Sequence, residues 1–255
     1  MKKIFIMIMA IMTACCLMAG CGGKEEKKAA APAQKILRVG TEPSFAPFEF
    51  AKEGSKELIG YDIDLINAVG KRMGYKVEIS SMGFDGLIPA IQAGNLDVAI
   101  SGFTITDERK KAIDFSDSYY TSGLTILVNK DNNSIKSIKD LEGKKVGCQI
   151  GTTGEMKSRS IKNAKVVAFN ANTEAIMELR NKGVDAVIND APVNDYFLAQ
   201  GGNKDCKVVG EKMEAEEYGI VMKKGSKLVP EVNKTLADMK KDGEFDKIYS
   251  KWFKK

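Results

Sequence analysis

Short apolar runs alternate with helically spaced apolar positions along most of the chain. The first run, 36–40, predicts a strand, and segment 62–73 repeats its apolar residues at the spacing of an amphipathic helix. The other predicted strands or extended pieces are 77–80, 96–101, 124–128, 145–150, 165–169 and 185–189. The other predicted helices are 86–93, 137–141, 152–161, 173–181, 192–199, 228–241 and 245–253. Such alternation is typical of α/β folds.

The order of these elements predicts two lobes. A strand–helix–strand–helix–strand unit occupies 36–101, and the same kind of repeat resumes after the extended piece 124–128. We expect each unit to form a mainly parallel sheet flanked by helices, with connecting loops at the carboxyl ends of the strands. Gly94 is expected to end the helix 86–93 in a left-handed conformation.

The N-terminal segment has the order of an export signal. Two lysines precede the apolar stretch 4–12, and small residues follow, which predicts that residues 1–20 are a signal peptide. The motif Met18-Ala19-Gly20-Cys21 resembles a lipobox and implies lipidation of Cys21; an ordinary signal peptide with an incidental cysteine is the alternative. Residues 21–35 are small, charged and proline-containing, and are expected to form a flexible tether.

The amino-acid composition limits which kinds of functional site are expected. The chain has no histidine, so it lacks the commonest general base and transition-metal ligand, and we expect no cofactor and no metal site. Its net charge of +5 is spread along the chain without a basic stripe, so nucleic-acid binding is not expected. Of the five cysteines, only Cys148 and Cys206 fall in the folded part, where we expect two buried thiols, or one disulfide if they are neighbours.

The run from Ser101 to Lys111 carries the clearest binding signal. It follows an apolar strand and opens a short predicted helix, so N–H groups, two threonine hydroxyls and the Arg109 guanidinium converge. An anion such as a carboxylate would fit this set, because a guanidinium can bind it through two hydrogen bonds. A solvated helix start is the alternative interpretation.

The segment 101–123, SGFTITDERKKAIDFSDSYYTSG, closely resembles the polar amino-acid-binding proteins of bacterial ABC importers, solute-binding family 3. The glutamine- and arginine-binding members are the nearest. Similarity also covers 40–50, 60–65 and 184–190, and it extends in order from 36 to 253.

The resemblance implies a type II periplasmic-binding-protein fold with the ligand in a cleft between two lobes. Lobe 1 would comprise 36–118 plus 219–255, and lobe 2 would comprise 124–213. Segments 119–123 and 214–218 would form a two-stranded hinge.

The resemblance also implies roles for individual residues. Arg109, assisted by Thr104 and Thr153, would bind the ligand's α-carboxylate. Asp190 would bind the α-ammonium with the Gly102 carbonyl, although the sequence alone equally allows it to cap the next helix. The expected ligand-binding set is Glu42, Phe45, Phe84, Ser101, Gly102, Thr104, Arg109, Gln149, Thr152, Thr153, Asn189 and Asp190, with Phe45 and Phe84 sandwiching the ligand side chain.

Three positions bear on selectivity. Glu42 would meet the ligand side chain, while Gln149 and Asn189 stand where the glutamine-selective pattern has lysine and histidine. Both departures leave the Glu42 carboxylate less neutralised, so a cationic partner would suit it. Arginine or lysine is therefore favoured, with glutamine next.

The resulting hypothesis is a monomeric, non-enzymatic receptor in the cell envelope. It would be lipid-anchored through Cys21, on the outer face of the cytoplasmic membrane or in the periplasm, and would deliver an L-amino acid to the transmembrane subunits of an ABC permease. The alternatives are an amino-acid sensor acting through a separate partner and a dehydratase of the same fold.

Overall fold

A computed structural model describes residues 34–253 of the chain, and residues 34–255 form one compact unit. The predicted signal peptide, the predicted lipidation site Cys21 and most of the predicted tether lie outside the described residues. None of the helices that the structure describes is long and apolar enough to cross a membrane.

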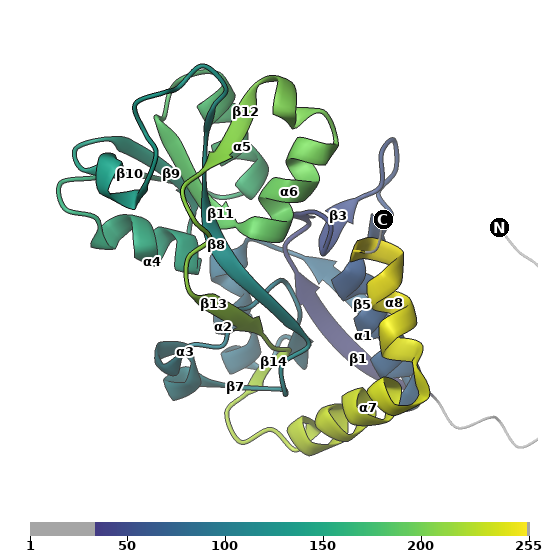
Figure 1. The fold of residues 1–255 in the computed structure, drawn as a ribbon. Helices are drawn as coiled ribbons and strands as arrows, with labels where there is room; N and C mark the ends of the chain where they lie inside the picture. The colour runs from purple at the N-terminus through teal and green to yellow at the C-terminus, as the bar shows by residue number, and fades with distance from the viewer. Residues whose placement is uncertain (1–33, 254–255) are drawn as a thin grey trace, which may run out of the picture. The chain divides into compact units, whose positions relative to one another are not determined.

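The described residues form the mixed α/β fold with two lobes that the pattern predicts (Figure 1). The sheet of lobe 1 has the order β5-β1-β6-β14-β7, in which β1 is parallel to β5 and β6, while β14 is antiparallel to β6 and β7. Its strands are β1 (Lys35–Thr41), β5 (Tyr75–Ser81), β6 (Val98–Ala99), β7 (Ile113–Phe115) and β14 (Val221–Lys223). Its helices are α1 (Tyr61–Arg72), α2 (Phe84–Ala93), α3 (Asp107–Ala112), α7 (Leu228–Asp242) and α8 (Glu244–Phe253).

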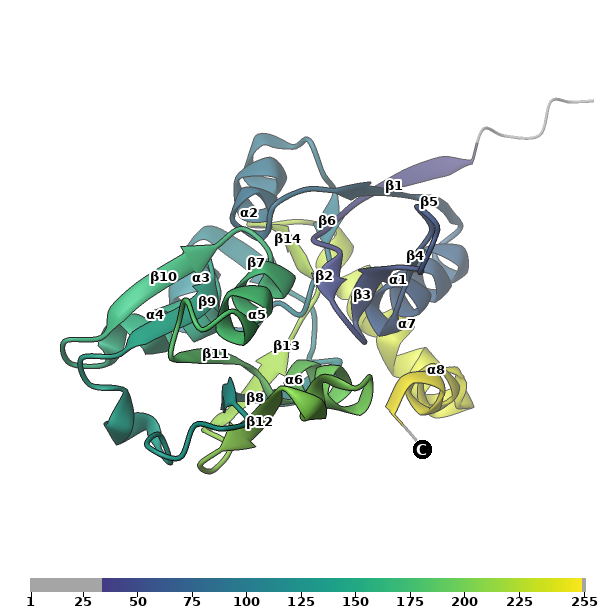
Figure 2. The same cartoon turned by 90° about the horizontal axis from the view of Figure 1, so that it is seen from above.

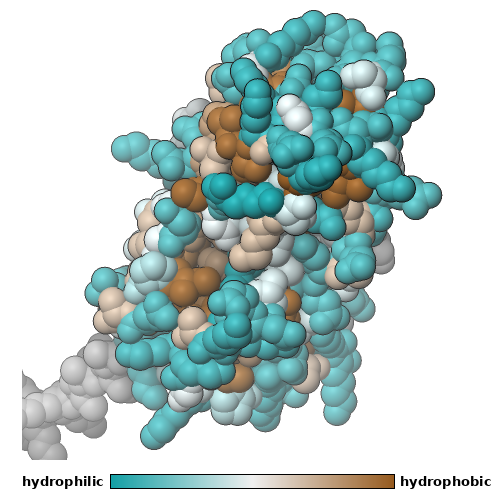
Figure 3. Space-filling view, turned by 90° about the vertical axis from the view of Figure 1, so that its left-hand side faces the viewer, coloured by the Kyte–Doolittle hydropathy of each residue, from teal (hydrophilic) through white to brown (hydrophobic). Residues whose placement is uncertain are grey.

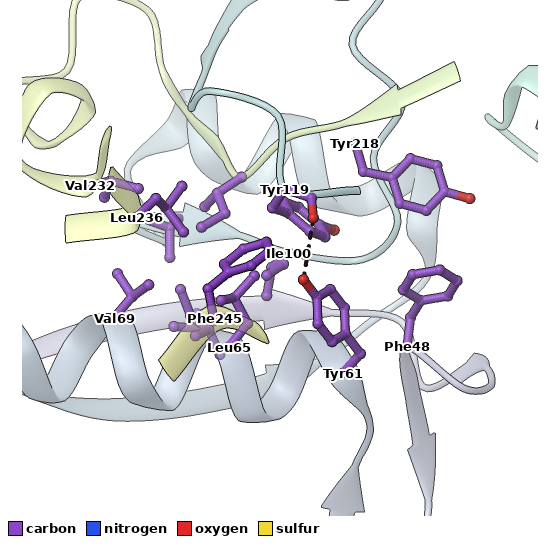
Figure 4. Packing of buried hydrophobic residues seen from close by; sticks show 14 of the residues in the cluster. Phe48, Tyr61, Leu65, Val69, Ile100, Tyr119, Tyr218, Val232, Leu236 and Phe245 are labelled. Atoms are coloured by element: carbon purple, nitrogen blue, oxygen red, sulfur yellow. Dashed lines mark hydrogen bonds between the residues drawn. The ribbon is translucent and has the colours of Figure 1, made fainter. Parts of the chain in front are cut away.

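The last two helices pack on α1, far from them in sequence. Leu65 and Val69 of α1 share a buried cluster with Val232 and Leu236 of α7 and with Phe245 of α8 (Figure 4). These residues recur at helical spacing, so each helix turns one apolar stripe inward. The burial of this stripe fixes the C-terminal segment against lobe 1.

Lobe 2 is built on the second large sheet, of order β10-β9-β11-β8-β12. Here β9 is parallel to β10 and β11, whereas β8 is antiparallel to β11 and β12. The strands are β8 (Tyr120–Asn129), β9 (Lys145–Gln149), β10 (Lys165–Phe169), β11 (Ala186–Asp190) and β12 (Cys206–Val209). The helices are α4 (Thr153–Ser160), α5 (Asn172–Arg180), α6 (Ala191–Ala199) and the 3-10 turns η1 (Ile138–Leu141) and η2 (Gly202–Lys204).

Two paired strands join the lobes. The first residues of β8 pair antiparallel with β13 (Ala215–Tyr218), with Tyr120 opposite Tyr218 and Gly123 opposite Ala215. Figures 1 and 2 show β13 beside the part of β8 where the chain passes between the lobes. The connection is therefore a two-stranded ribbon.

Some elements differ from the sequence prediction. The strand predicted over 96–101 is reduced to Val98–Ala99, and the chain turns soon after it at Gly102, which adopts a left-handed backbone with φ of 54°. A small third sheet, made of β2 (Ser44–Phe45), β3 (Glu49–Ala51) and β4 (Leu58–Ile59), was not predicted.

Other predictions are confirmed. Gly94 ends α2 in the left-handed region, with φ of 77°. Cys148 and Cys206 are both buried and free, as expected for two separate thiols.

Candidate functional site

A small cavity lies between the two lobes, with about 290 Å³ of space not filled by atoms, part of it open to solvent. It lies at the carboxyl ends of parallel strands in both large sheets, where α/β proteins generally bind ligands. The structure brings eleven of the twelve expected residues to it. The lining residues are Glu42, Phe45, Glu49, Phe84, Ser101, Gly102, Thr104, Arg109, Gln149, Thr152, Thr153 and Asp190.

Asn189 is the expected residue that the structure does not bring to this cavity. Its side-chain amide donates to Asn194 Oδ1 of α6 at 3.4 Å, and both side chains are buried. Successive strand residues point to opposite faces of a sheet. Asp190 therefore faces the cavity while its neighbour packs against α6.

Arg109 on α3 is the cationic group of the cavity. Its side chain is 6% exposed, and its guanidinium donates to the carbonyls of Thr104 at 2.8 Å and of Gly151 at 2.9 Å. It also lies over the stacked rings of Phe84 and Phe103, 5.5 and 5.3 Å from their centroids. Burial lowers the pKa of Arg109 to about 10 despite nearby carboxylates, so the group remains charged at neutral pH.

Asp190 ends β11 on the lobe 2 side. It occupies the N-cap position of α6, but its carboxylate makes no capping bond and accepts instead from Ser122 at 2.9 Å and from the Tyr218 hydroxyl. Burial raises its pKa to about 7, and the bonds from Tyr218 and Ser122 act in the opposite direction. An additional cation beside this carboxylate would favour its ionised form.

Glu42 follows β1 and faces Gln149 across the cavity. One of its oxygens accepts from the Ser44 hydroxyl at 2.6 Å and from the Gln149 amide at 2.9 Å. Burial nevertheless raises the pKa of Glu42 above its ordinary value. These partners are neutral, so the Glu42 carboxylate has no cation among its hydrogen-bond partners.

The two phenylalanines expected to flank the ligand come from lobe 1. Phe45 is in β2 and Phe84 begins α2, and each is 6% exposed. A Cβ added to Gly102 would lie 2.8 Å from the Phe45 ring, so only glycine lets the chain pass this close.

Sequence reasoning missed Glu49, which lines the cavity from β3. Glu49 is fully buried, and burial followed by the charge of Asp62 raises its pKa well above the usual range. Asp62 accepts from Gly102 N at 2.9 Å and from the Tyr119 hydroxyl at 2.9 Å, while Ser101 donates to Glu49 at 2.7 Å. The two acids therefore hold the turn at 101–102 that faces the cavity.

The threonine hydroxyls expected to bind a carboxylate already have a partner. Thr104 and Thr153 both donate to one oxygen of Glu216, at 3.0 and 2.9 Å. Thr152 caps α4 by accepting from Glu155 N at 3.2 Å. The N-terminus of α4 thus faces the cavity with its cap in place.

The chain is similar to known proteins over nearly its whole length. Residues 37–255 match the model for bacterial extracellular solute-binding proteins, family 3. The chain is 34% identical over 257 residues to the arginine-binding extracellular protein ArtP of Bacillus subtilis (strain 168), covering 99% of this chain and 98% of that protein.

Two solved structures are also similar. An ancestral arginine-binding protein bound to arginine superposes with a TM-score of 0.83 at 49% identity, covering 86% of this chain and 99% of that one. An ancestral arginine-binding protein bound to glutamine gives a TM-score of 0.81 at 48% identity, with 87% and 99% covered. These likenesses extend over both lobes.

Proposed function

Since the chain belongs to the bacterial extracellular solute-binding proteins of family 3, we propose that it captures a polar L-amino acid outside the cytoplasm and delivers it to an ABC permease. We propose arginine or lysine as the preferred ligand, with glutamine next. The proposed protein is a monomeric receptor that is lipid-anchored through Cys21, and it is a binder rather than an enzyme.

The observation that carries the proposal is the pairing of opposite charges in one buried cavity. Arg109 from lobe 1 and Asp190 from lobe 2 both line it, and each is 6% exposed. The Arg109 guanidinium would bind the α-carboxylate, and the Asp190 carboxylate would bind the α-ammonium. Because these partners belong to different lobes, a bound amino acid would stabilise the closed arrangement.

The proposed preference for a cationic side chain depends on Glu42. Its carboxylate is buried and is bonded by the neutral groups of Ser44 and Gln149. A guanidinium or ammonium brought to it would add the missing positive charge, whereas a glutamine amide would add one neutral hydrogen bond. Phe45 and Phe84 would flank the aliphatic stem of the ligand.

Titration calorimetry of arginine, lysine and glutamine against the wild type and Glu42→Gln tests this assignment. We expect the substitution to weaken arginine and lysine binding by roughly 30-fold, about 2 kcal/mol, because it removes one partner of a buried charge pair. Glutamine binding should change by less than about threefold. Glu53→Gln, at an exposed position of lobe 1, is the matched control.

An equal loss for glutamine and arginine would contradict the role of Glu42 in selectivity. Failure of the wild type to bind any amino acid would contradict the proposed function itself. Incubation with a prephenate-like acid, followed by product analysis, addresses the dehydratase alternative, and we expect no turnover.

A further inference from the structure

We propose that Glu216 is a latch that holds the two lobes closed, acting as a positioning residue behind the ligand site. The inference rests on the proposed function, because it concerns the closure that ligand binding would stabilise. Nothing in the sequence pattern singles out this carboxylate, which is one of three glutamates in the run 214–217.

One oxygen of Glu216 contacts both lobes at once. It accepts from Thr104 Oγ1, in the loop of lobe 1 before α3, at 3.0 Å, and from Thr153 Oγ1, at the start of α4 in lobe 2, at 2.9 Å. The two hydroxyls are themselves 3.5 Å apart. Hydrogen bonds to a charged acceptor are stronger than those between neutral groups, so this junction stabilises the contact between the lobes.

A rotation of the lobes would affect the bonds from Thr104 and Thr153 to Glu216 differently. Glu216 lies on β13, and this strand is held to the loop of lobe 1 by two backbone contacts. One is the hydrogen bond from Ile105 N to Glu217 O at 2.7 Å, and the other is the β-bridge between Thr104 and Tyr218. The bond to Thr104 would therefore survive opening. Thr153 belongs to α4, which packs on the sheet of lobe 2, so its bond would break when the lobes separate.

The carboxylate reaches the threonines from outside the ligand cavity. Glu216 lines a separate groove with Thr153, Met156 and Met213, and it does not line the cavity that contains Arg109. It therefore does not line that cavity itself, but it takes the hydroxyl hydrogens of Thr104 and Thr153, which do line it. If Glu216 instead repelled a bound carboxylate, its removal would strengthen arginine binding, whereas the removal of a latch would weaken it. The direction of the change in affinity therefore distinguishes these two roles.

A latch of this kind changes the affinity without contacting the ligand. When only a fraction of the molecules is closed, the apparent Kd equals the intrinsic Kd divided by that fraction. Removing Glu216 should lower the closed fraction and raise the dissociation rate. Other bonds between the lobes, such as those from Arg109 to the Gly151 carbonyl and from Gln149 to Glu42, each at 2.9 Å, would remain in place.

The test compares Glu216→Ala with Glu217→Ala, which removes the same charge from the exposed neighbouring side chain. Arginine affinity is measured by calorimetry, and dissociation by stopped-flow fluorescence of Trp252, the only tryptophan. The Trp252 ring lies 5.9 Å from Phe50, and Phe50 lies 5.8 Å from Tyr196 of lobe 2, so it should report closure. We expect roughly tenfold weaker binding and faster dissociation for Glu216→Ala, and less than a twofold change for Glu217→Ala.

X-ray scattering without ligand provides a readout that does not need binding. Glu216→Ala should show a larger radius of gyration than the wild type, and Glu216→Gln, which keeps an acceptor oxygen, should lie between them. In the same scattering measurement, Thr153→Val should open the lobes about as far as Glu216→Ala, and the double variant should open no further.

Unchanged scattering together with unchanged or tighter arginine binding would overturn the latch. If the wild type binds no amino acid, the proposed function fails, but the scattering comparison still decides whether Glu216 holds the lobes together. If Glu216→Ala does not fold, Glu216→Gln and Thr153→Val provide the same comparison with smaller changes.

Discussion

The two walls of the cavity differ in composition. The lobe 1 wall carries Arg109, Glu42 and Glu49 together with the two phenylalanine rings, whereas the lobe 2 wall carries neutral polar side chains and one acid, Asp190. In the proposed function, lobe 1 would therefore determine which ligand is bound. Lobe 2 would then complete the site and close it.

The largest effect should come from the cation of the lobe 1 wall. Arg109→Met should weaken arginine binding by at least about 100-fold, because the ligand carboxylate would be buried without its positive partner. Calorimetry measures the loss, and Arg180→Met, at an exposed ion pair with Asp205 in lobe 2, is the control. If the variant bound arginine within threefold of the wild-type affinity, Arg109 would not be the partner of the ligand carboxylate.

The acid of the lobe 2 wall should control the pH dependence of binding. The pKa of Asp190 is raised to about 7 by burial, and its ionised form is the one that would bind an ammonium group. The affinity should therefore fall as the pH falls below about 7, by up to roughly tenfold per unit. Calorimetry between pH 5 and 8 measures this slope.

Asp190→Asn provides the control for that slope. The variant should bind weakly and show a much flatter pH profile, because the titrating group has been removed. If it keeps the wild-type slope, another acid of the site controls binding instead.

A smaller effect concerns the acids behind the lobe 1 wall. Burial raises the pKa of Asp62 to about 6 and that of Glu49 well above its usual value, so the folded protein holds protons that the unfolded chain releases near pH 4. The free energy of unfolding should decrease as the pH rises from about 4.5 to 6, which denaturant titration measures. Glu49→Gln should show a shallower decrease; an unchanged or steeper one would contradict this assignment.

Much of the fold was predictable because it depends on local periodicity. The helices α1, α7 and α8 follow from apolar residues at helical spacing, and the parallel strands follow from short apolar runs between turns. The sheet of β2, β3 and β4 was missed because strands of two or three residues have too few positions to show alternation.

The site was less completely predictable, and Asn189 and Glu216 show why. Asn189 and Asp190 are adjacent, and the strand's alternation places only one of them in the cavity. Glu216 meets Thr104 and Thr153 only through tertiary structure, across sequence separations of 112 and 63 residues. A local sequence pattern cannot predict a contact between residues this far apart in the chain.

Thermal unfolding with each of the twenty L-amino acids tests directly whether this chain binds an amino acid. The chain from residue 22, which contains the whole compact unit 34–255, would first be unfolded and refolded to remove any carried ligand. A ligand at about 100 times its Kd should add about 2.7 kcal/mol to the free energy of unfolding. We expect the largest rise in Tm with arginine or lysine and a smaller one with glutamine. No rise with any amino acid would contradict the proposed amino-acid binding.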